Sequence, residues 1–224
     1  MINITDIFEN KDVADKVSWW LDDNVDTTEL AGAAENALSA HVLALSVVPK
    51  NVSVLWPWVE KFHVKIMPRF YLATIGVDVV AKMSVDIKSG FKHGADGAHV
   101  IVKLNDLDRF ADLMLPVRDD LFFNKDFSVG FDISEIWPLD WENVFTNLKK
   151  LRATSMLLML TNDAGDKSDF TGRIYAALDA WDADQNMELH IMLGNSFERA
   201  EQVYRLVAKM RPELLDKLHF WVNY

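Results

Sequence analysis

Three side chains with chemically useful groups stand in apolar stretches in the middle of the chain. His99 and Lys103 belong to the apolar run 98–104, and Asp132 lies near the end of the run 127–133. If the first run is a β-strand, its alternating side chains place His99 and Lys103 on the same face. Histidine titrates near neutral pH and can transfer protons, and a deprotonated lysine can attack a carbonyl carbon to form an imine. We therefore predict acid–base chemistry for His99, imine formation or oxyanion stabilisation for Lys103, and an orienting role for Asp132.

Each of these three residues also has a structural interpretation. His99 can be a core histidine held by one hydrogen bond, and Lys103 can be a solvated lysine at a strand end. Asp132 needs a partner wherever it is buried, because an unpaired buried carboxylate is costly. That partner can be Lys103 or His99, in a catalytic or in a structural role.

Six other polar residues interrupt the strand candidates or stand near their ends, where they could contact a ligand. Arg69 could clamp a phosphate or a carboxylate with its planar guanidinium, or it could form a structural ion pair. Asp26 could contact a ligand or cap the helix that follows it. The predicted ligand-contacting residues are Asp26, Ser46, Arg69, Thr161, His190 and Asn195.

The sequence predicts no metal site and no cofactor. It contains no cysteine, which excludes disulfides, thiolate nucleophiles and thiolate ligands for a metal. Its six histidines include no pair with His-x-x-x-His spacing. The acidic loop 162–169 lacks the closing glutamate of an EF-hand, so we interpret it as a solvated loop or as a lid over the site. No P-loop, nucleophile-elbow or kinase signature is present.

The overall composition narrows the classes of partner. The 224 residues carry a net charge of −11, which opposes binding to nucleic acid or to anionic lipid. The longest apolar runs are far shorter than the ~20 residues that span a bilayer, and the first residues lack the features of a secretory signal. These features predict a cytoplasmic protein with no nucleic-acid partner and no membrane partner. A homo-oligomer is compatible with them.

Regularly alternating strand and helix patterns must position the candidate side chains. Apolar strand candidates fall at 42–48, 64–73, 98–104, 127–133, 155–161, 187–193 and 218–222. Helical patterns fall before and between them at 29–40, 52–62, 77–91, 107–115, 141–151, 169–181 and 197–210. A weak strand near Val25 would complete a set of eight, and a leading helix is predicted over 7–21.

This alternation predicts the fold class. Strands separated by helices form a parallel sheet that is covered on both faces. Eight such units in a single domain of residues 1–224 predict a (β/α)8 TIM barrel. The last helix is absent after the final strand, and we expect the leading helix in its place. A doubly wound open sheet is the alternative; it is disfavoured because no strand is followed by a Gly-x-Gly-x-x-Gly turn.

Five motifs occur in the order and at the spacing of one known barrel family. They are VDTT at 25–28, ALSVVPKNV at 44–52, GADGAHVIV at 94–102, VGFD at 129–132, and Gly194 followed by FERA at 197–200. Together they resemble the class I aldolases of the deoxyribose-phosphate aldolase type over nearly the whole chain. The resemblance implies a TIM barrel with aldolase-like (lyase) chemistry on a small carbonyl compound, with or without a phosphate group.

The residues that would carry the family's reaction are not matched. The resemblance implies an imine-forming lysine on the sixth strand and a second lysine on the seventh. Residues 155–161 contain no lysine, and His190 or Ile191 occupies the second position. His99 stands where the family has a fourth-strand aspartate, and residues 221–224 lack its Gly/Ser phosphate loop.

Three functions therefore stay open. The leading hypothesis is an aldolase-like enzyme that cleaves a C–C bond or transfers a proton beside a carbonyl, using residues other than the family's. The alternatives are a catalytically inactive barrel that serves as a binding or assembly module, and an isomerase or decarboxylase on the same fold. A polar pocket in which His99, Lys103 and Asp132 converge would favour an enzyme. An apolar, filled barrel mouth would favour the inactive barrel.

Overall fold

Eight parallel strands form a closed barrel at the centre of the molecule. The computed structural model describes residues 10–159, 167–181 and 186–224. Each strand pairs with the next one along the chain, and β8 pairs with β1, which closes the barrel. The strands are β1 Val17–Trp20, β2 Ala44–Val47, β3 Lys65–Leu72, β4 Gly97–Val102, β5 Asp126–Asp132, β6 Ser155–Met159, β7 Glu188–Gly194 and β8 Leu218–Asn223. The predicted (β/α)8 TIM barrel is confirmed.

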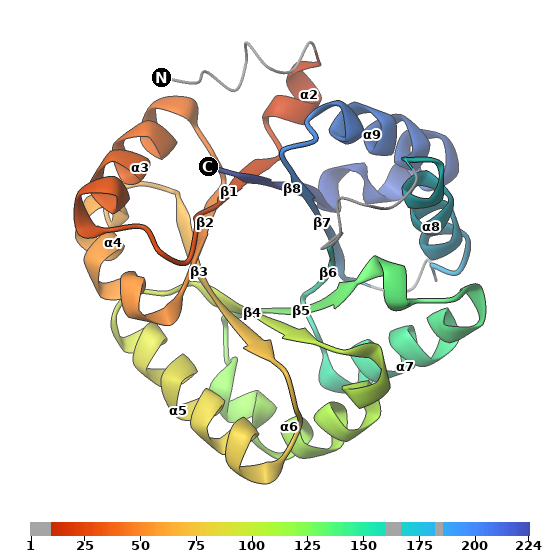
Figure 1. Ribbon diagram of the computed structural model, residues 1–224, viewed down its shortest axis with the longest axis horizontal. Helices are drawn as coiled ribbons and strands as arrows, with labels where there is room; N and C mark the ends of the chain where they lie inside the picture. Colours follow the sequence, from red (N-terminus) through yellow and green to blue (C-terminus); the bar gives the residue numbers. More distant parts are fainter. Residues whose placement is uncertain (1–9, 160–166, 182–185) are drawn as a thin grey trace.

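Helices form a ring around the barrel (Figure 1). They are α2 Lys11–Ala14, α3 Thr27–Ala40, α4 Val52–Val59, α5 Val77–Lys92, α6 Leu107–Leu121, α7 Trp141–Leu151, α8 Lys167–Asp179 and α9 Glu198–Met210. The short helix α2 precedes β1 and lies in the ring between α3 and α9 (Figure 1).

The first strand lies earlier in the chain than predicted. The prediction of a leading helix over 7–21 is wrong from Val17 onward, because Val17–Trp20 is β1 and only Lys11–Ala14 is helical among the described residues before it. The prediction of a weak strand near Val25 is also wrong, since this part of the chain is a loop.

Burial on both sides of β1 explains this error. All four of its side chains are buried. Trp19 packs outside the barrel on Tyr224, with ring centroids 4.6 Å apart, whereas Trp20 packs inside the barrel against His99. A strand covered on both faces gives a continuous apolar run, and its spacing cannot be distinguished from that of a short helix segment.

Helix α3 begins at a capping box that involves a predicted site residue. The Asp26 carboxylate accepts hydrogen bonds from the backbone N–H groups of Thr28 and Glu29. The Glu29 carboxylate accepts in turn from the backbone N–H of Asp26, at 2.9 Å. These contacts satisfy N–H groups that have no partner within the helix, so Asp26 takes the capping role.

The turn between α5 and β4 depends on Gly94. This residue has a φ of +101°, a conformation that side chains with a Cβ rarely adopt. A Cβ at this position would lie 1.8 Å from the Trp56 ring, so the indole occupies the space that a side chain would need. The turn therefore delivers the chain into β4 only with glycine here.

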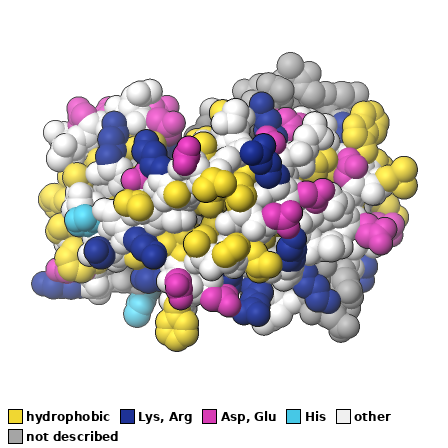
Figure 2. Space-filling model, turned by 90° about the horizontal axis from the view of Figure 1, so that it is seen from below, with side chains coloured by type: hydrophobic (Ala, Val, Ile, Leu, Met, Phe, Trp, Pro, Cys, Tyr) yellow, Lys and Arg dark blue, Asp and Glu magenta, His cyan; other side chains and the backbone are white. Residues whose placement is uncertain are grey.

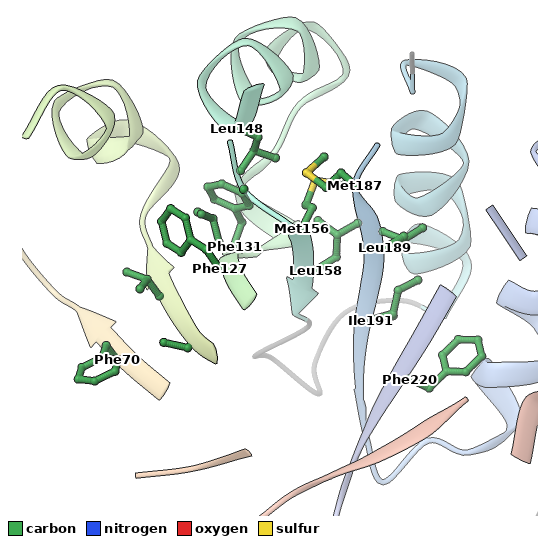
Figure 3. Packing of buried hydrophobic residues seen from close by; sticks show 14 of the residues in the cluster. Phe70, Phe127, Phe131, Leu148, Met156, Leu158, Met187, Leu189, Ile191 and Phe220 are labelled. Atoms are coloured by element: carbon green, nitrogen blue, oxygen red, sulfur yellow. The ribbon is translucent and has the colours of Figure 1, made fainter. Parts of the chain in front are cut away.

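The main hydrophobic core lies between the barrel and the helices. Strand side chains at alternate positions point outward and meet the apolar faces of the helices. Figure 3 shows part of this layer, in which Phe127 and Phe131 of β5, Met156 and Leu158 of β6, and Leu189 and Ile191 of β7 leave the sheet on its outer side.

A second cluster fills the inside of the barrel. It consists of Trp20, Ala44, Met67, Leu157, Met159, Met192 and Trp221, with Ile101 packed against it. Buried polar residues, among them Ser46, His99, Ser128 and Ser155, occupy other positions on the barrel strands. The barrel interior is therefore a packed core, as in other TIM barrels.

On one outer face of the molecule, apolar side chains lie between charged ones. Figure 2 shows the face at the bottom of Figure 1, where hydrophobic side chains gather in the middle between basic and acidic ones. The exposed large apolar residues of α5 and α6 are Val77, Val85, Leu115 and Val117. None of the helices that the structure describes has the length and apolar character that crossing a membrane requires.

Candidate functional site

A polar pocket opens at the carboxyl end of the barrel, beside the ends of β1, β3, β7 and β8. Its volume is about 510 Å³. TIM-barrel sites lie at this end, because the loops that follow the strands converge there. The rings of Trp20 and Tyr224 contribute to its wall, and its polar lining consists of Asp22, Asp23, Asn24, Arg69, Asn195 and Asn223. We refer to it as the carboxyl-end pocket.

Arg69 is held by hydrogen bonds on several sides of its guanidinium. Nη1 donates to the backbone carbonyl of Ser46 at 2.7 Å, and Nε donates to Oδ1 of Asp23 at 3.1 Å. Nη2 donates to the same Asp23 oxygen and to the backbone carbonyl of Leu21. The guanidinium carbon lies 4.8 Å from the centre of the Trp20 ring. Of the two alternatives for Arg69, the structure shows an ion pair, which neutralises its charge inside the pocket.

His99 lies in the middle of the packed barrel. It is 0% exposed, and its ring centroid lies 5.6 Å from that of Trp20 and 4.7 Å from that of Trp221. Neither ring nitrogen has a hydrogen-bond partner among the described residues. Burial lowers the pKa of His99 well below its ordinary value, and the nearby His190 and Arg69 lower it further. His99 is therefore a neutral imidazole, shielded from the pocket by aromatic rings.

Lys103 and Asp132 lie on the rim of the barrel, at the ends of β4 and β5. Lys103 is exposed, whereas Asp132 is half-buried and accepts a hydrogen bond from the Ser134 backbone N–H at 2.8 Å. Ile101 pairs with Gly130, so the ends of β4 and β5, where these two residues lie, are adjacent on the rim.

His99 stands apart from this rim pair. It lies four residues before Lys103, which corresponds to ~13 Å along a strand. The side chain of Ile101 lies between them on the same face and packs against the inner cluster. The structure thus places Lys103 and Asp132 on the same rim of the barrel and separates both from His99.

Two of the predicted ligand-contacting residues line the carboxyl-end pocket. They are Arg69 and Asn195, and the side chain of Asn195 is exposed. Ser46 is fully buried and reaches Arg69 through its backbone carbonyl only. Its hydroxyl has no partner among the described residues.

The remaining predicted residues lie elsewhere. Asp26 caps α3, and His190 lies near the opposite, amino-terminal end of the barrel. Thr161 lies outside the described residues, as does most of the predicted lid loop 162–169, of which only the start of α8 is described.

Other side chains occupy the positions that the aldolase resemblance assigns to lysines. On β6, Leu157 and Met159 belong to the cluster inside the barrel. On β7, Met192 belongs to the same cluster, and His190 packs beside His99 with ring centroids 6.2 Å apart. No described residue of these two strands places an amine inside the barrel.

A second group of titratable side chains gathers at the amino-terminal end of β7 and β8. His190 Nε2 lies 3.0 Å from Glu188 Oε2, and His219 Nε2 lies 3.6 Å from the same oxygen. The other ring nitrogen of His190, Nδ1, accepts a hydrogen bond from Trp221 Nε1 at 3.3 Å. We call Glu188, His190 and His219 the amino-end cluster.

Sequence reasoning missed this cluster and the ion-pair partner of Arg69. The spacing Glu188-x-His190 could have placed two members of the cluster on one face of a strand. The third, His219, joins them only because β7 and β8 pair with His190 opposite His219. Asp23 lies in the loop after β1, so the misplaced first strand concealed its position next to Arg69.

Comparisons with known proteins identify the fold through solved structures alone. No protein-family profile matches the sequence, and no curated protein matches it. A structure from Toxoplasma gondii ME49, provisionally described as a deoxyribose-phosphate aldolase, is 15% identical; the match covers 99% of this chain and 92% of that one, with a TM-score of 0.73.

Two further structures show the same likeness. One from Coccidioides immitis, also provisionally described as a deoxyribose-phosphate aldolase, is 12% identical over 94% of this chain and 81% of that one, with a TM-score of 0.69. The tetrameric deoxyribose phosphate aldolase from Aeropyrum pernix is 11% identical over 84% and 81% of the two chains, with a TM-score of 0.66. The resemblance predicted from the strand-end motifs is confirmed at the level of the fold, and this protein has the (β/α)8 architecture of those aldolase structures.

Proposed function

We propose that this protein is an aldolase-like barrel that binds a small carbonyl compound in the carboxyl-end pocket and forms no imine inside the barrel. The filled barrel interior carries this proposal. Leu157, Met159 and Met192 occupy the inward positions of β6 and β7 and are buried. Imine formation needs an amine within ~3–3.5 Å of the carbonyl carbon, and these strands supply none there. Of the functions that the sequence left open, the binding barrel fits this interior best.

The charges in the pocket favour an uncharged ligand. Asp23 neutralises Arg69, and Asp22 adds a further negative charge to the lining. The side chains of Asn195 and Asn223 are exposed and can both donate and accept hydrogen bonds. A short hydroxylated aldehyde or ketone matches this lining better than its phosphate ester, which would meet the carboxylates.

Calorimetric titration with glyceraldehyde and with glyceraldehyde 3-phosphate tests this proposal. We expect glyceraldehyde to bind more tightly, and Asn223→Ala to weaken its binding at least about fivefold. Asn105→Ala removes an exposed amide that is not part of the pocket lining and serves as the matched control. Tighter binding of the phosphate ester, or equal binding by the two variants, would contradict the proposal.

An enzyme that uses Lys103 is the second candidate. The adjacent ends of β4 and β5 support it, because Lys103 follows one and Asp132 ends the other, and a carboxylate close to the amine can orient it and accept protons. Borohydride reduction in the presence of glyceraldehyde, followed by peptide mass spectrometry, tests this candidate. An adduct on Lys103 that is lost in Lys103→Ala and retained in Lys50→Ala would favour the enzyme. Lys50 is an exposed lysine that follows β2 at the same barrel end. An unmodified wild-type Lys103 would exclude imine chemistry at this residue.

A homo-oligomer is a further part of the proposal. Exposed apolar side chains on α5 and α6, such as Val85 at 66% exposure, support it, because contiguous apolar surface often marks a protein interface. The Aeropyrum pernix neighbour is tetrameric. Light scattering at micromolar concentration should report an oligomer that Val85→Glu dissociates, whereas a monomeric wild type would contradict it.

A further inference from the structure

We propose that the amino-end cluster of Glu188, His190 and His219 binds a divalent metal ion. One donor atom from each residue lies within 4.8 Å of the other two. Two of the separations are 3.0 Å and 3.6 Å. A zinc ion held ~2.1 Å from each donor keeps its donors roughly 3.4 Å apart, so small ring rotations would complete the site. The cluster lies at the end of the barrel opposite the carboxyl-end pocket, so this proposal is independent of the proposed function.

The barrel architecture presents the three donors on one face. Glu188 and His190 are two residues apart on β7 and therefore point to the same side. His219 pairs with His190 across the β7–β8 ladder. Two imidazoles and one carboxylate are the donor set of open zinc sites, in which a water molecule takes the fourth position. The side chains of Glu188 and His219 are 43% and 23% exposed, so water and ions have access to this position.

The positive charge of Lys65, which acts on the cluster, is paired with another carboxylate. Lys65 lies close enough to influence Glu188 electrostatically, but its Nζ is 2.6 Å from Asp126 Oδ2. Lys16 influences His219 in the same way. These two lysines reduce the attraction for a cation, and the Glu188 carboxylate supplies the opposing negative charge.

Trp221 determines how tightly the metal binds. Its indole N–H donates to Nδ1 of His190, which leaves the ring proton on Nε2, facing Glu188. A metal on Nε2 requires the proton on Nδ1 instead, so the contact with Trp221 must break. Trp221 is thus a positioning residue that favours the metal-free tautomer, and its replacement by phenylalanine should strengthen metal binding.

Metal titration of the untagged protein tests the proposal. Binding of Zn²⁺ is measured by calorimetry, and Co²⁺ is used as a probe because its visible absorption reports tetrahedral coordination. We expect one ion per chain, with affinity at least about tenfold lower in Glu188→Gln and in His219→Ala. His63→Ala is the matched control, because His63 is an exposed histidine outside the cluster. It should bind like the wild type.

The possible outcomes separate this site from surface binding. Absence of stoichiometric binding in the wild type would overturn the proposal, as would equal affinity in His63→Ala and His219→Ala. Trp221→Phe should bind at least severalfold more tightly. Weaker binding by this variant, with its thermal unfolding still cooperative, would overturn the tautomer argument.

Discussion

The buried guanidinium of Arg69 and the carboxylate of Asp23 form an ion pair at the carboxyl end of the barrel, with Nε 3.1 Å from Oδ1. The Arg69 side chain is 1% exposed, whereas that of Asp23 is 55% exposed. The pair therefore joins a charge in the packed barrel to one in water, and it ties the loop after β1 to β3. Both the stability of the barrel mouth and the charge of the pocket depend on it.

Asp23→Asn should destabilise the fold by about 1–2 kcal/mol. The amide keeps one acceptor for Arg69 but removes the charge that compensates a buried guanidinium, and the exposure of Asp23 limits the loss. Urea unfolding followed by circular dichroism measures the change. Asp22→Asn, which alters the adjacent exposed carboxylate, should change stability by less than about 0.5 kcal/mol. Equal effects of the two substitutions would show that the ion pair contributes nothing specific.

The same substitution should change which anions the pocket accepts. In the wild type Asp23 neutralises Arg69, so inorganic phosphate should bind weakly. Asp23→Asn leaves the guanidinium charge uncompensated, and phosphate affinity should rise severalfold, more at low ionic strength. Phosphate titration at two salt concentrations provides the measurement. If phosphate binds the wild type more tightly than the variant, the pocket is an anion site and the uncharged-ligand proposal fails.

The free energy of unfolding should fall as the pH is lowered from about 6.5 towards 4. Burial lowers the pKa of His99 well below its ordinary value, and burial together with the charge of His190 lowers the pKa of His219 to about 4. The unfolded chain binds protons at these histidines near pH 6.5, and the folded chain does not. Stability is therefore fully present above pH 6.5 and is lost below it, by up to about 1.4 kcal/mol per pH unit for each histidine.

Urea unfolding at pH 7.5, 6.0 and 5.0 measures this dependence. His99→Leu should flatten the pH dependence, because the leucine cannot titrate, while the contribution of His219 stays. His63→Leu changes an exposed histidine outside the barrel core and should keep the wild-type slope. Equal slopes in all three proteins would mean that His99 binds its proton as readily in the folded chain as in the unfolded one, which contradicts this prediction.

Gly94→Ala should destabilise the fold by more than about 2 kcal/mol. The φ of +101° strains any residue with a Cβ, and the new methyl group would overlap the Trp56 ring. Gly32→Ala is the opposite case, since Gly32 lies within α3 and its Cβ would meet no atom within 4 Å. This control should stabilise the protein by about 0.5–1 kcal/mol, because alanine is the better helix former. Thermal unfolding of both variants gives the comparison, and a stable Gly94→Ala would contradict the strained turn.

Much of the fold could be predicted because turn and helix patterns in the sequence border each strand after the first one. The apolar runs at 127–133 and 187–193 coincide with β5 and β7 to within one residue, since turns and helical patterns border them. The first strand could not be located in this way. In Val17–Trp20 the side chains are buried both inside and outside the barrel, so no alternation marks the strand.

The candidate site was predictable only in part. The neighbouring positions of Lys103 and Asp132 follow from strand order, because consecutive parallel strands end on the same rim. The burial of His99 does not follow from strand order. Residue spacing predicts the face of the strand on which His99 lies, but it does not predict that the rings of Trp20 and Trp221 enclose this side chain.

The sequence by itself determined the alternation of strands and helices, the barrel that follows from it and the lack of lysines on the sixth and seventh strands. Only the tertiary structure decided which polar groups meet. Arg69 and Asp23 are 46 residues apart in sequence, and Glu188 and His219 meet through the register of two strands. The physical reason is that local pattern sets the direction of each side chain, whereas closure of the barrel and the register of its strands set the distances between them.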